Sequence, residues 1–416
     1  MLPPAPGLPS PLGSRKPVAI TGLGAISALG SNPQEFWQAL INGHSAIAPI
    51  SLVDTSNLRF KNAAEVRNYE PSRHFPHGVD LLDRFAQFAV VAARQALSDS
   101  AVQVTPELRA RTAIITGSSV GGQSSEDSAF LSLYGSTSPR VPPFTIPRAM
   151  TNAGASHIGI DLGITGPAFT LSTACSSSNH ALGLAFWMVA SGIAELAIAG
   201  GSEAPFSYGL LKAWEAMRVV SPDTCRPFSR DRKGMILGEG AAMLVLEPLD
   251  QAQARGAKIY AEIAGFGMSA DAHHSTAGNL EGPVAAMRAA LCDAGIEAHQ
   301  VGYINAHGTG TALNDSTESR AINLTFGGHA KRLFVSSTKS SHGHALGAAS
   351  ALEAVATALA VKHQLLPPTC NFTEPDPACD LRLVVNQAQP AEVEYAISNS
   401  FAFGGLNAAI VFRRHG

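Results

Sequence analysis

Short apolar segments that end at glycines alternate with longer helical segments along most of this chain of 416 residues. In the first half, residues 17–30 and 111–122 are predicted strands, and residues 81–100 between them have helical periodicity. The second half repeats the unit, with a predicted helix at 283–295 and a predicted strand at 301–311. Such alternation is typical of an α/β fold with buried sheets, and its recurrence predicts two similar halves.

The boundaries of the two halves follow from composition. Residues 1–17 are rich in proline and have no apolar core of the signal-peptide kind, so they are predicted to be a disordered tail. The folded region is expected to span 18–412. Its first half is expected to cover about 18–257 and its second half about 258–412, and the polar segment 249–258 contains the expected junction.

Composition argues against several classes of protein. A net charge of −3 at pH 7 gives no reason to expect nucleic acid or an anionic membrane as the main partner. The five cysteines are scattered without a CxxC pair, which argues against a zinc site or a disulfide framework and favours a cytoplasmic location. The most membrane-like stretch, 181–201, is interrupted by Glu195 and by glycines, so it is predicted to be a buried helix followed by a buried strand.

One glycine pair raises the question of a dinucleotide site. Gly22 and Gly24 match part of the glycine fingerprint of dinucleotide-binding turns, but Ser27 stands where the third glycine should be. No clear acidic-tipped second strand follows. We therefore do not expect a nicotinamide cofactor.

The segment FTLSTACSSSNHALG (169–183) places Cys175 between a predicted strand and a predicted helix. At the N-terminal end of a helix, the helix dipole is expected to lower the pKa of a thiol and to favour the nucleophilic thiolate. Small neighbouring residues leave room for a substrate. This segment alone is equally compatible with Cys175 as a small buried hydrophobic residue.

Two histidine-containing turns favour the catalytic interpretation. NAHGTGT places His307 at the end of an apolar strand, and STKSSHGH places Lys339, His342 and His344 between a strand and an alanine-rich helix. A single histidine is more often structural than catalytic. A cysteine with two imidazoles suits thiol acyl transfer, because imidazoles can donate hydrogen bonds to a developing oxyanion or move a proton. A zinc site is disfavoured, because no carboxylate motif accompanies the histidines.

The segment SNSFAFGGLNAAIVF (398–412) contains Phe401 and Phe403 in front of two glycines and an apolar strand. As a structural element it is a hairpin. It could also form a movable aromatic lid beside a pocket, with backbone N–H groups free to hold an oxyanion.

Taken together, these segments resemble the β-ketoacyl-acyl-carrier-protein synthases, specifically the elongating, type II-like ketosynthases of the thiolase superfamily. TACSSS, NAHGTGT, SSTKSSHGHALGAA and NSFAFGG stand in the family's order and spacing, and the resemblance covers about 18–412. It implies a ketosynthase domain with the thiolase fold, in which two similar α/β halves form a layered α-β-α-β-α architecture. It also implies a homodimer, or a heterodimer with a related ketosynthase-like subunit.

The resemblance implies an acyltransferase that carries out a decarboxylative Claisen condensation. Cys175 would carry an acyl chain delivered by acyl carrier protein, and His307 and His344 would stabilise the enolate formed when malonyl-acyl-carrier protein loses CO₂. The product would be a 3-oxoacyl chain two carbons longer, in fatty-acid or polyketide synthesis. The backbone amides of Cys175 and Phe403 would form the oxyanion hole, and Phe403, beside Phe401, would gate the acyl pocket. No metal or other cofactor is implied, because the substrates travel on the phosphopantetheine arm of the carrier protein.

Two supporting sets of residues also match family positions. Lys339 and Glu318 match a buried ion pair that orders the site. Thr276, Thr309 and Thr311 match positions that line the phosphopantetheine tunnel.

An acidic carrier protein is expected to dock on basic residues. The candidates are Arg73, Arg84, Arg218, Arg226, Arg230, Arg232 and Lys233. Structural ion pairs within a solvated loop, with Asp223 and Asp231 as partners, explain the same charges equally well. Electrostatic docking would make the association sensitive to salt.

The sequence departs from the family pattern beside the motifs. Ala402 replaces a glycine before the gating phenylalanine, Leu406 replaces a threonine, and His342 stands where a smaller residue is usual. SSSNHA after the cysteine is closer to specialised relatives, such as those that make nodulation-factor or polyene chains. These departures bear on which substrate the protein uses and not on its reaction, because every catalytic group is present.

Three other functions have to be compared with this one. A non-catalytic chain-length subunit would usually lack the nucleophile, whereas Cys175 is present here. A cysteine acyl-hydrolase could use Cys175, one histidine and Asn399, but it would not need paired histidines. A degradative thiolase would need a second cysteine as base, and both candidate turns carry histidine instead.

Overall fold

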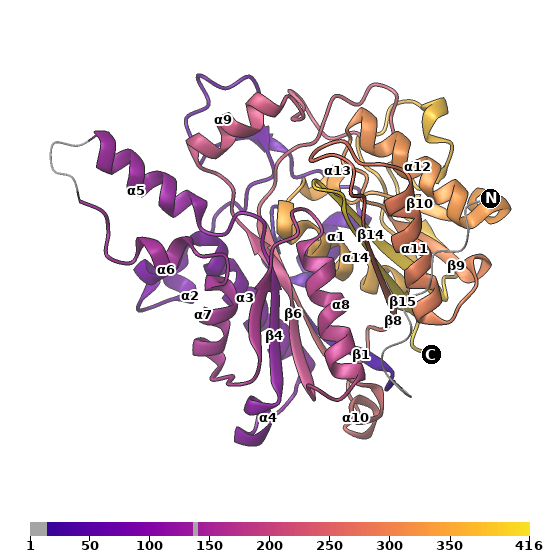
Figure 1. The fold of residues 1–416 in the computed structure, drawn as a ribbon, viewed down its shortest axis with the longest axis horizontal. Helices are drawn as coiled ribbons and strands as arrows, with labels where there is room; N and C mark the ends of the chain where they lie inside the picture. Colours follow the sequence, from indigo (N-terminus) through magenta and orange to yellow (C-terminus); the bar gives the residue numbers. More distant parts are fainter. Residues whose placement is uncertain (1–14, 136–139) are drawn as a thin grey trace.

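The computed structural model describes residues 15–135 and 140–416 (Figure 1). Most of the predicted tail lies outside these ranges. Within them, eleven strands form one mixed sheet in the order β12-β10-β9-β14-β15-β8-β1-β7-β6-β4-β5. The strands of the first half are β1 (Val18–Ser27), β4 (Thr112–Gly117), β5 (Ala168–Leu171), β6 (Leu196–Glu203) and β7 (Gly240–Pro248). Those of the second half are β8 (Ala261–Ala270), β9 (Val301–Asn305), β10 (Phe334–Ser336), β12 (Arg382–Leu383), β14 (Tyr395–Ala402) and β15 (Leu406–Arg413).

Helices and two short strand pairs complete the described fold. The helices of the first half are α1 (Pro33–Ile41), α2 (Pro71–His74), α3 (Arg84–Ser100), α4 (Pro106–Ala110), α5 (Gln123–Gly135), α6 (Thr145–Ala149), α7 (Ala153–Leu162), α8 (Ser177–Ala190), α9 (Tyr208–Met217) and α10 (Leu249–Ala254). Those of the second half are α11 (Glu281–Ala294), α12 (Ala312–Phe326), α13 (Lys339–His342) and α14 (Ala349–His363). The short pairs are β2 (Ala48–Pro49) with β3 (Asn62–Ala63), and β11 (Leu365–Leu366) with β13 (Gln389–Pro390).

The two halves of the sheet have the same pattern of strand pairing. β5, β4 and β6 are parallel neighbours, and β7 and β1 follow in antiparallel pairing. β10, β9 and β14 are likewise parallel, and β15 and β8 follow in antiparallel pairing. The halves join where residues 18–20 of β1 pair with residues 261–263 of β8. The predicted repetition is therefore present in the topology, and the exact domain boundaries stay a prediction.

The helices form layers around the two halves of the sheet. α3 packs on β1, β7 and β6, and α11 packs on β8 and β15. α8 and α14 lie between the halves, since each contacts strands of both (Figure 1). Residues 349–361 of α14 are all buried, as a central position requires. This arrangement is the expected α-β-α-β-α architecture.

The predicted secondary structure is largely confirmed. The helix expected at 81–100 is α3, the helix expected at 283–295 is α11, and the membrane-like stretch 181–201 forms the end of α8 and the start of β6. The expected junction at 249–258 contains the short helix α10. Within the described ranges, no helix is both long enough and apolar enough to cross a membrane.

Gly22 and Gly24 lie inside the continuous strand β1 and not in a cofactor-binding turn. A Cβ atom at Gly24 would overlap the carbonyl oxygen of Ala92 in α3, and a Cβ atom at Gly22 would overlap that of Ala96. These glycines therefore allow the backbone of α3 to approach the sheet closely. The partial fingerprint is explained by packing.

This contact predicts that Gly24→Ala destabilises the fold by about 2 kcal/mol, because the added methyl group forces β1 and α3 apart. Urea unfolding followed by circular dichroism measures the change. Gly328→Ala is the matched control, since a Cβ atom there meets no other atom within 4 Å. Equal stability of the Gly24→Ala variant and the wild type would contradict the packing explanation.

Candidate active site

Cys175 lies in the turn between β5 and α8, where the sequence predicts it. The residue before it, Ala174, has a φ of 51°, a left-handed conformation that is strained for alanine. The hydroxyl of Ser119 donates to the carbonyl oxygen of Ala174 at 2.8 Å and helps to hold this turn. The side chain of Cys175 reaches a buried position, with 8% of the residue exposed.

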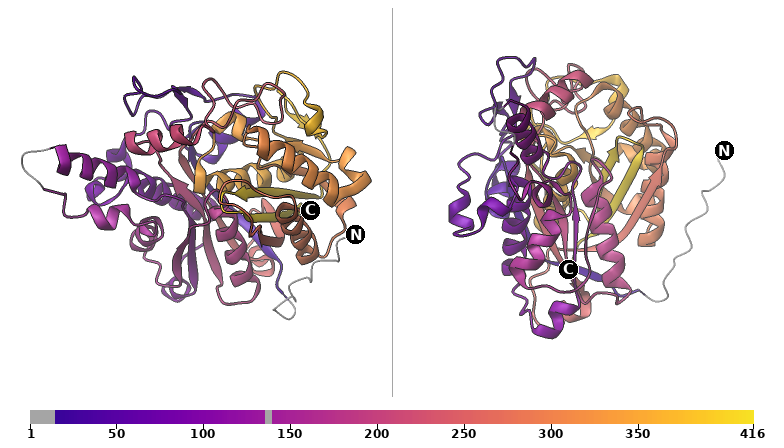
Figure 2. Two further views of the ribbon diagram at one scale, coloured as in Figure 1. Left: turned by 45° about the horizontal axis from the view of Figure 1, so that its top comes forward. Right: turned by 60° about the vertical axis from the view of Figure 1, so that its left-hand side comes forward.

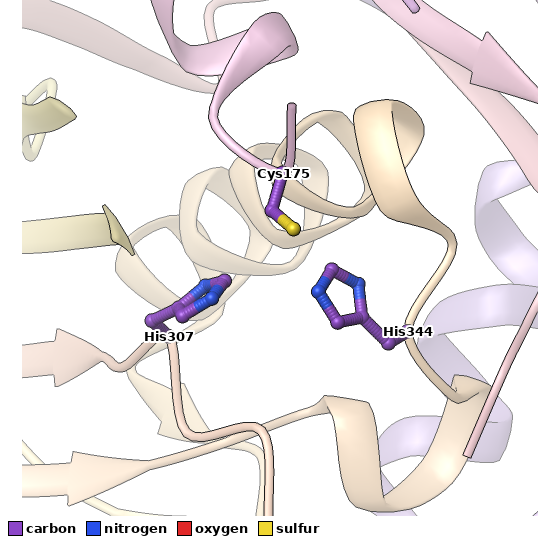
Figure 3. A group of neighbouring side chains, drawn as sticks. All are labelled: Cys175, His307 and His344. Carbon is purple, nitrogen blue, oxygen red and sulfur yellow. The ribbon is translucent and has the colours of Figure 1, made fainter. Parts of the chain in front are cut away.

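Cys175, His307 and His344 meet in the folded chain. One nitrogen of each imidazole and the sulfur of Cys175 all lie within 4.8 Å of one another, and all three residues are buried. The sulfur points between the two rings (Figure 3). The rings meet edge to face, with centroids 5.5 Å apart. Residues from both halves of the fold thus converge on one point.

The backbone of His307 is fixed just after β9. Its N–H group donates to Oε1 of Glu318 at 2.9 Å, and the N–H group of Gly308 donates to Oε2 at 2.8 Å. The fully buried carboxylate of Glu318 therefore clamps this turn from α12. Burial raises the pKa of Glu318 to about 7, and the two backbone N–H groups oppose that rise.

The backbone of His344 is held by the segment between α9 and β7. Its N–H group donates to the carbonyl oxygen of Ile236 at 2.7 Å, and its carbonyl oxygen accepts from Gly238 at 2.9 Å. The N–H group of Leu346 donates to Nδ1 of the His344 ring at 3.2 Å. The ring therefore receives a hydrogen bond on the nitrogen that faces its own turn.

Lys339 connects His307 to a buried carboxylate. Its ammonium group donates to the carbonyl oxygen of His307 at 2.7 Å, lies 3.3 Å from Nδ1 of the same residue, and forms an ion pair with Glu353. The predicted ion pair of Lys339 with Glu318 is therefore wrong. Glu318 is engaged by the backbone of the His307 turn, and Glu353 projects from α14 toward the ammonium group instead.

The hydrogen bonds determine where each imidazole carries its proton. Burial and the positive charge of Lys339 hold the pKa values of His307 and His344 well below the usual range, so both rings are neutral. In each ring Nδ1 accepts a hydrogen bond, from Lys339 in one case and from Leu346 in the other. A neutral imidazole has one protonated nitrogen, which must then be Nε2. The site therefore has two neutral N–H donors.

The expected lowering of the Cys175 pKa is wrong for this structure. Burial raises the pKa of the thiol to about 11, and the positive charge of Lys339 and the N–H groups of Phe403 and of Cys175 itself only partly oppose it. The start of a helix contributes about 0.3–1 kcal/mol to a nearby charge, whereas burial of a charged group can shift a pKa by several units. The resting thiol is therefore protonated.

The aromatic turn forms the tip of the β14–β15 hairpin. The Phe401 ring meets the His307 ring at 6.3 Å between centroids, and the Phe403 ring stacks on Trp214 at 6.4 Å. The N–H group of Gly404 donates to the carbonyl oxygen of Ser275 at 2.7 Å. The turn thus contacts the site on one side and a loop of the second half on the other.

A cavity of about 140 Å³ lies behind this turn. Phe401 and Phe403 line it, together with the predicted tunnel residues Thr276 and Thr311. The third tunnel residue, Thr309, is buried beside them, with its hydroxyl 2.9 Å from that of Thr311. Thr276 and Thr311 thus line this cavity, and Thr309 contacts it through Thr311.

The residues that depart from the family pattern are all packed into the fold. Ala402 ends β14 opposite Leu406, whose carbonyl oxygen accepts a hydrogen bond from the hydroxyl of Ser176 at 2.9 Å. His342 is fully buried, with Nε2 3.0 Å from the hydroxyl of Thr338 and the ring against Phe36. Burial lowers the pKa of His342 to about 3, so this ring is neutral.

Most of the basic docking candidates form ion pairs within the chain. The pairs are Arg73 with Glu70, Arg84 with Glu239, Arg226 with Asp223 and Asp231, Arg230 with Glu374, Arg232 with Asp315 and Asp376, and Lys233 with Asp223. The side chain of Arg232 is only 5% exposed. Arg218 is exposed and forms no ion pair with the described residues. The alternative of structural ion pairs therefore explains most of these charges.

Sequence reasoning missed two buried carboxylates beside the site, Glu203 and Glu353. Glu353 is the single acid in an alanine-rich helix, and a charge in such a helix requires a buried partner. That signal could have identified the partner of Lys339. Asn399, the proposed third member of a hydrolase triad, contacts Glu318 and Met287 and orients neither histidine.

Comparison with known proteins agrees with the geometry. Residues 15–252 match the family model "Beta-ketoacyl synthase, N-terminal domain", and residues 260–373 match "Beta-ketoacyl synthase, C-terminal domain". The chain belongs to the β-ketoacyl synthase family. The expectations of a ketosynthase, an acyltransferase and a thiolase fold are thereby confirmed.

Individual relatives cover nearly the whole chain. Nodulation protein E of Rhizobium sp. (strain N33) is 44% identical over 95% of this chain and 99% of its own length. 3-Oxoacyl-[acyl-carrier-protein] synthase 2 of Staphylococcus aureus (strain COL) is 41% identical over 97% and 99%. A solved structure described as the ishigamide ketosynthase/chain length factor has a TM-score of 0.93 and 37% identity, over 97% of this chain and 100% of that chain.

The corrected ion pair can be tested by a double-mutant cycle. Lys339→Met leaves Glu353 buried without a partner and is expected to cost about 3–5 kcal/mol of folding free energy. Adding Glu353→Leu should recover more than about 1 kcal/mol of that loss. The measurement is urea unfolding of the single and double variants.

The control cycle pairs Lys339→Met with Glu318→Leu, which share no direct contact. A larger coupling energy for Lys339 with Glu318 than with Glu353 would contradict the assignment.

Proposed function

We propose that this protein catalyses the decarboxylative condensation of an acyl chain on Cys175 with malonyl-acyl-carrier protein. The observation that carries the proposal is the arrangement of two neutral imidazole donors around one buried thiol. A hydrolase would need a general base, and neither protonated Nε2 atom is free to accept a proton. Two such donors suit an oxygen that gains negative charge.

The first step transfers the acyl chain to the enzyme. The sulfur of Cys175 attacks the thioester carbonyl of an acyl-carrier protein, a new C–S bond forms, and the bond to the phosphopantetheine sulfur breaks. The proton of the Cys175 thiol leaves with the departing phosphopantetheine thiol, so the step needs no net proton. The high pKa of the resting thiol is therefore compatible with loading.

The backbone amides of Cys175 and Phe403 form the oxyanion hole in this proposal. Both N–H groups act on the sulfur atom of Cys175, which places them beside the carbonyl oxygen of a bound acyl chain. Phe403 lies at the boundary between the sulfur and the threonine-lined cavity, and its ring gates the acyl pocket. Phe401 contacts His307 and supports the same turn.

The second step forms the new carbon–carbon bond. The malonyl thioester loses CO₂, and the electron pair moves onto the thioester oxygen, which accepts hydrogen bonds from His307 and His344. The enolate carbon then attacks the acyl carbonyl on Cys175, and the C–S bond to the enzyme breaks. The released thiolate takes a proton from solvent. Lys339 positions His307 throughout and keeps its Nε2 protonated.

The partners follow from the substrates and from the relatives. The Staphylococcus aureus relative is named for acyl carrier protein, and we propose the same carrier here, with Thr276, Thr309 and Thr311 around its phosphopantetheine arm. The condensation needs no resident cofactor, since the carrier protein brings both reactants. A cytoplasmic location fits these partners and stays a prediction.

We propose a specialised acyl chain as the substrate. The relatives described above include nodulation protein E and the ishigamide ketosynthase/chain length factor. Two of the departures from the family pattern, Ala402 and Leu406, face each other beside the aromatic turn of the β14–β15 hairpin. A specialised fatty-acid or polyketide chain fits this position among relatives. A panel of acyl-carrier proteins would define its length.

The roles of the three site residues predict a separation of the two steps. Cys175→Ala is expected to block acyl loading completely, because no other described side chain places a thiol at this point. His307→Ala and His344→Ala should load acyl chains and lose at least about a hundredfold in decarboxylation, since each removes one donor. Intact-protein mass spectrometry measures loading, and release of ¹⁴CO₂ from malonyl-carrier protein measures decarboxylation.

Cys292→Ala is the matched control, since this thiol is exposed on α11. Normal loading of Cys175→Ala would contradict the nucleophile assignment. Release of free acid from the wild-type enzyme without condensation would favour the hydrolase. A folded wild-type dimer that never loads would favour a chain-length partner subunit.

We propose that the protein forms a dimer through an exposed edge of the sheet. β5 is the last strand at this edge, and α5 projects from the body of the protein on the same side (Figure 2). Large apolar side chains are exposed there, namely Leu131, Tyr134, Ile146, Ile160 and Phe169. An exposed strand edge with apolar neighbours is suited to pairing with another subunit. The partner subunit is a second copy or a related ketosynthase-like chain.

Phe169→Lys in β5 is therefore expected to shift the protein from dimer to monomer, because it places a charge at the centre of this edge. Light scattering coupled to size-exclusion chromatography measures the mass. Leu324→Lys, an equally radical change at an exposed site on α12, is the control. A dimer that survives Phe169→Lys and dissociates with Leu324→Lys would place the interface elsewhere.

A further inference from the structure

Glu203 is a buried carboxylate that the proposed reaction leaves without a role. It ends β6, and none of its surface is exposed. No cationic side chain of the described residues neutralises it, since its partners are hydroxyl and backbone groups. Burial raises the pKa of Glu203 to about 7, and these hydrogen bonds oppose the rise. Burying an acid without a counter-ion costs folding free energy, so we expect Glu203 to have a role through the contacts that it makes.

Four donors converge on this carboxylate. Oε1 accepts from the hydroxyl of Ser118 at 2.9 Å and from the N–H group of Val120 at 3.2 Å. Oε2 accepts from the N–H group of Ser119 at 2.7 Å and from that of Gly347 at 3.0 Å. Glu203 thus joins the loop after β4 to the loop after His344.

Both loops lead directly to the reacting groups. Ser119, held through its N–H group, donates its hydroxyl to the carbonyl oxygen of Ala174, which precedes Cys175. Gly347 follows Leu346, whose N–H group fixes the His344 ring. A single carboxylate therefore connects the strained cysteine turn with the turn that orients one histidine.

The charge of Glu203 also acts on the thiol. Among the groups that face Cys175, Lys339 from α13 lowers its pKa and Glu203 from β6 raises it. His307 and His344 are neutral and add no charge. Glu203 therefore opposes the effect of Lys339 across the site.

We propose that Glu203 is a positioning residue that fixes Cys175 relative to His344 and adds a negative charge to the surroundings of the thiol. The inference rests on the proposed role of Cys175 as the acyl carrier. A carboxylate suits this position because it can accept from all four donors. In either orientation, a glutamine would place its own N–H₂ group against at least one backbone N–H group.

The test compares Glu203→Gln, which removes the charge, with Glu203→Asp, which keeps the charge and shortens the reach. The readout is the rate at which iodoacetamide alkylates Cys175 across alkaline pH, followed by peptide mass spectrometry so that other cysteines do not interfere. Glu203→Gln should shift the profile toward lower pH, so that alkylation at a fixed alkaline pH is at least about twofold faster. Glu203→Asp should keep the wild-type profile and lose at least about tenfold in acyl transfer.

Two controls separate this role from general disruption. Glu247→Gln removes another buried carboxylate, at the far end of β7, and should leave the alkylation profile and acyl transfer unchanged. Ser119→Ala removes the hydrogen bond to Ala174 without changing any charge. It should slow acyl transfer and leave the pH profile of Cys175 alkylation unchanged. If Glu203→Gln fails to fold, Ser119→Ala still tests the positioning role.

An alkylation profile of Glu203→Gln that coincides with the wild type, or an equal shift in Glu203→Asp, would overturn the electrostatic role. Wild-type acyl transfer in both Ser119→Ala and Glu203→Asp would overturn the positioning role. The alkylation profiles depend only on the thiol, so they are informative even if no acyl chain loads. If the wild-type enzyme does not load an acyl chain, the proposed function is contradicted, but the alkylation profiles of the variants can still be compared.

Discussion

The chemistry of the site depends on one buried ammonium group. Lys339 holds the backbone and the ring of His307 and is neutralised by Glu353 from the central helix α14. Burial, together with this charge, keeps both histidines neutral, and the hydrogen bond from Lys339 to Nδ1 places the His307 proton on the opposite nitrogen. Without this ion pair, His307 would lose the hydrogen bond that directs its proton to Nε2, and Glu353 would be a buried acid without a counter-ion.

The duplicated architecture explains how distant segments reach this ammonium group. Cys175 comes from the turn after β5 in the first half, whereas His307 and His344 follow β9 and α13 in the second half. The helices α8 and α14 lie between the two halves and pack against each other. Cys175, just before the start of α8, therefore lies near the segments of the second half. The aromatic turn at the tip of β14 and β15 covers the same point from the opposite side.

Sequence could predict the segments that meet at the site, because each has a local signature. The turn at Cys175 follows from the strand–helix switch, and the His307 turn follows from the glycines after an apolar strand. Which carboxylate pairs with Lys339 could not be predicted, since Glu318 and Glu353 are both buried acids on helices and only tertiary packing separates them. The sign of the Cys175 pKa shift could not be predicted from the sequence either, because the degree of burial decides between desolvation and the helix dipole. The local ion pairs of Arg226 and Lys233 with Asp223 could be predicted, whereas those of Arg84 with Glu239 and of Arg230 with Glu374 join segments that are distant in sequence.

The most direct test of this picture is the position of the protons in the resting site. Neutron diffraction from a deuterated crystal would show the deuterium on each imidazole and on the sulfur. We predict deuterium on the sulfur of Cys175 and on Nε2 alone of both His307 and His344. Deuterium on both nitrogens of either ring, beside a bare sulfur, would instead show a thiolate–imidazolium pair and contradict the two-donor site.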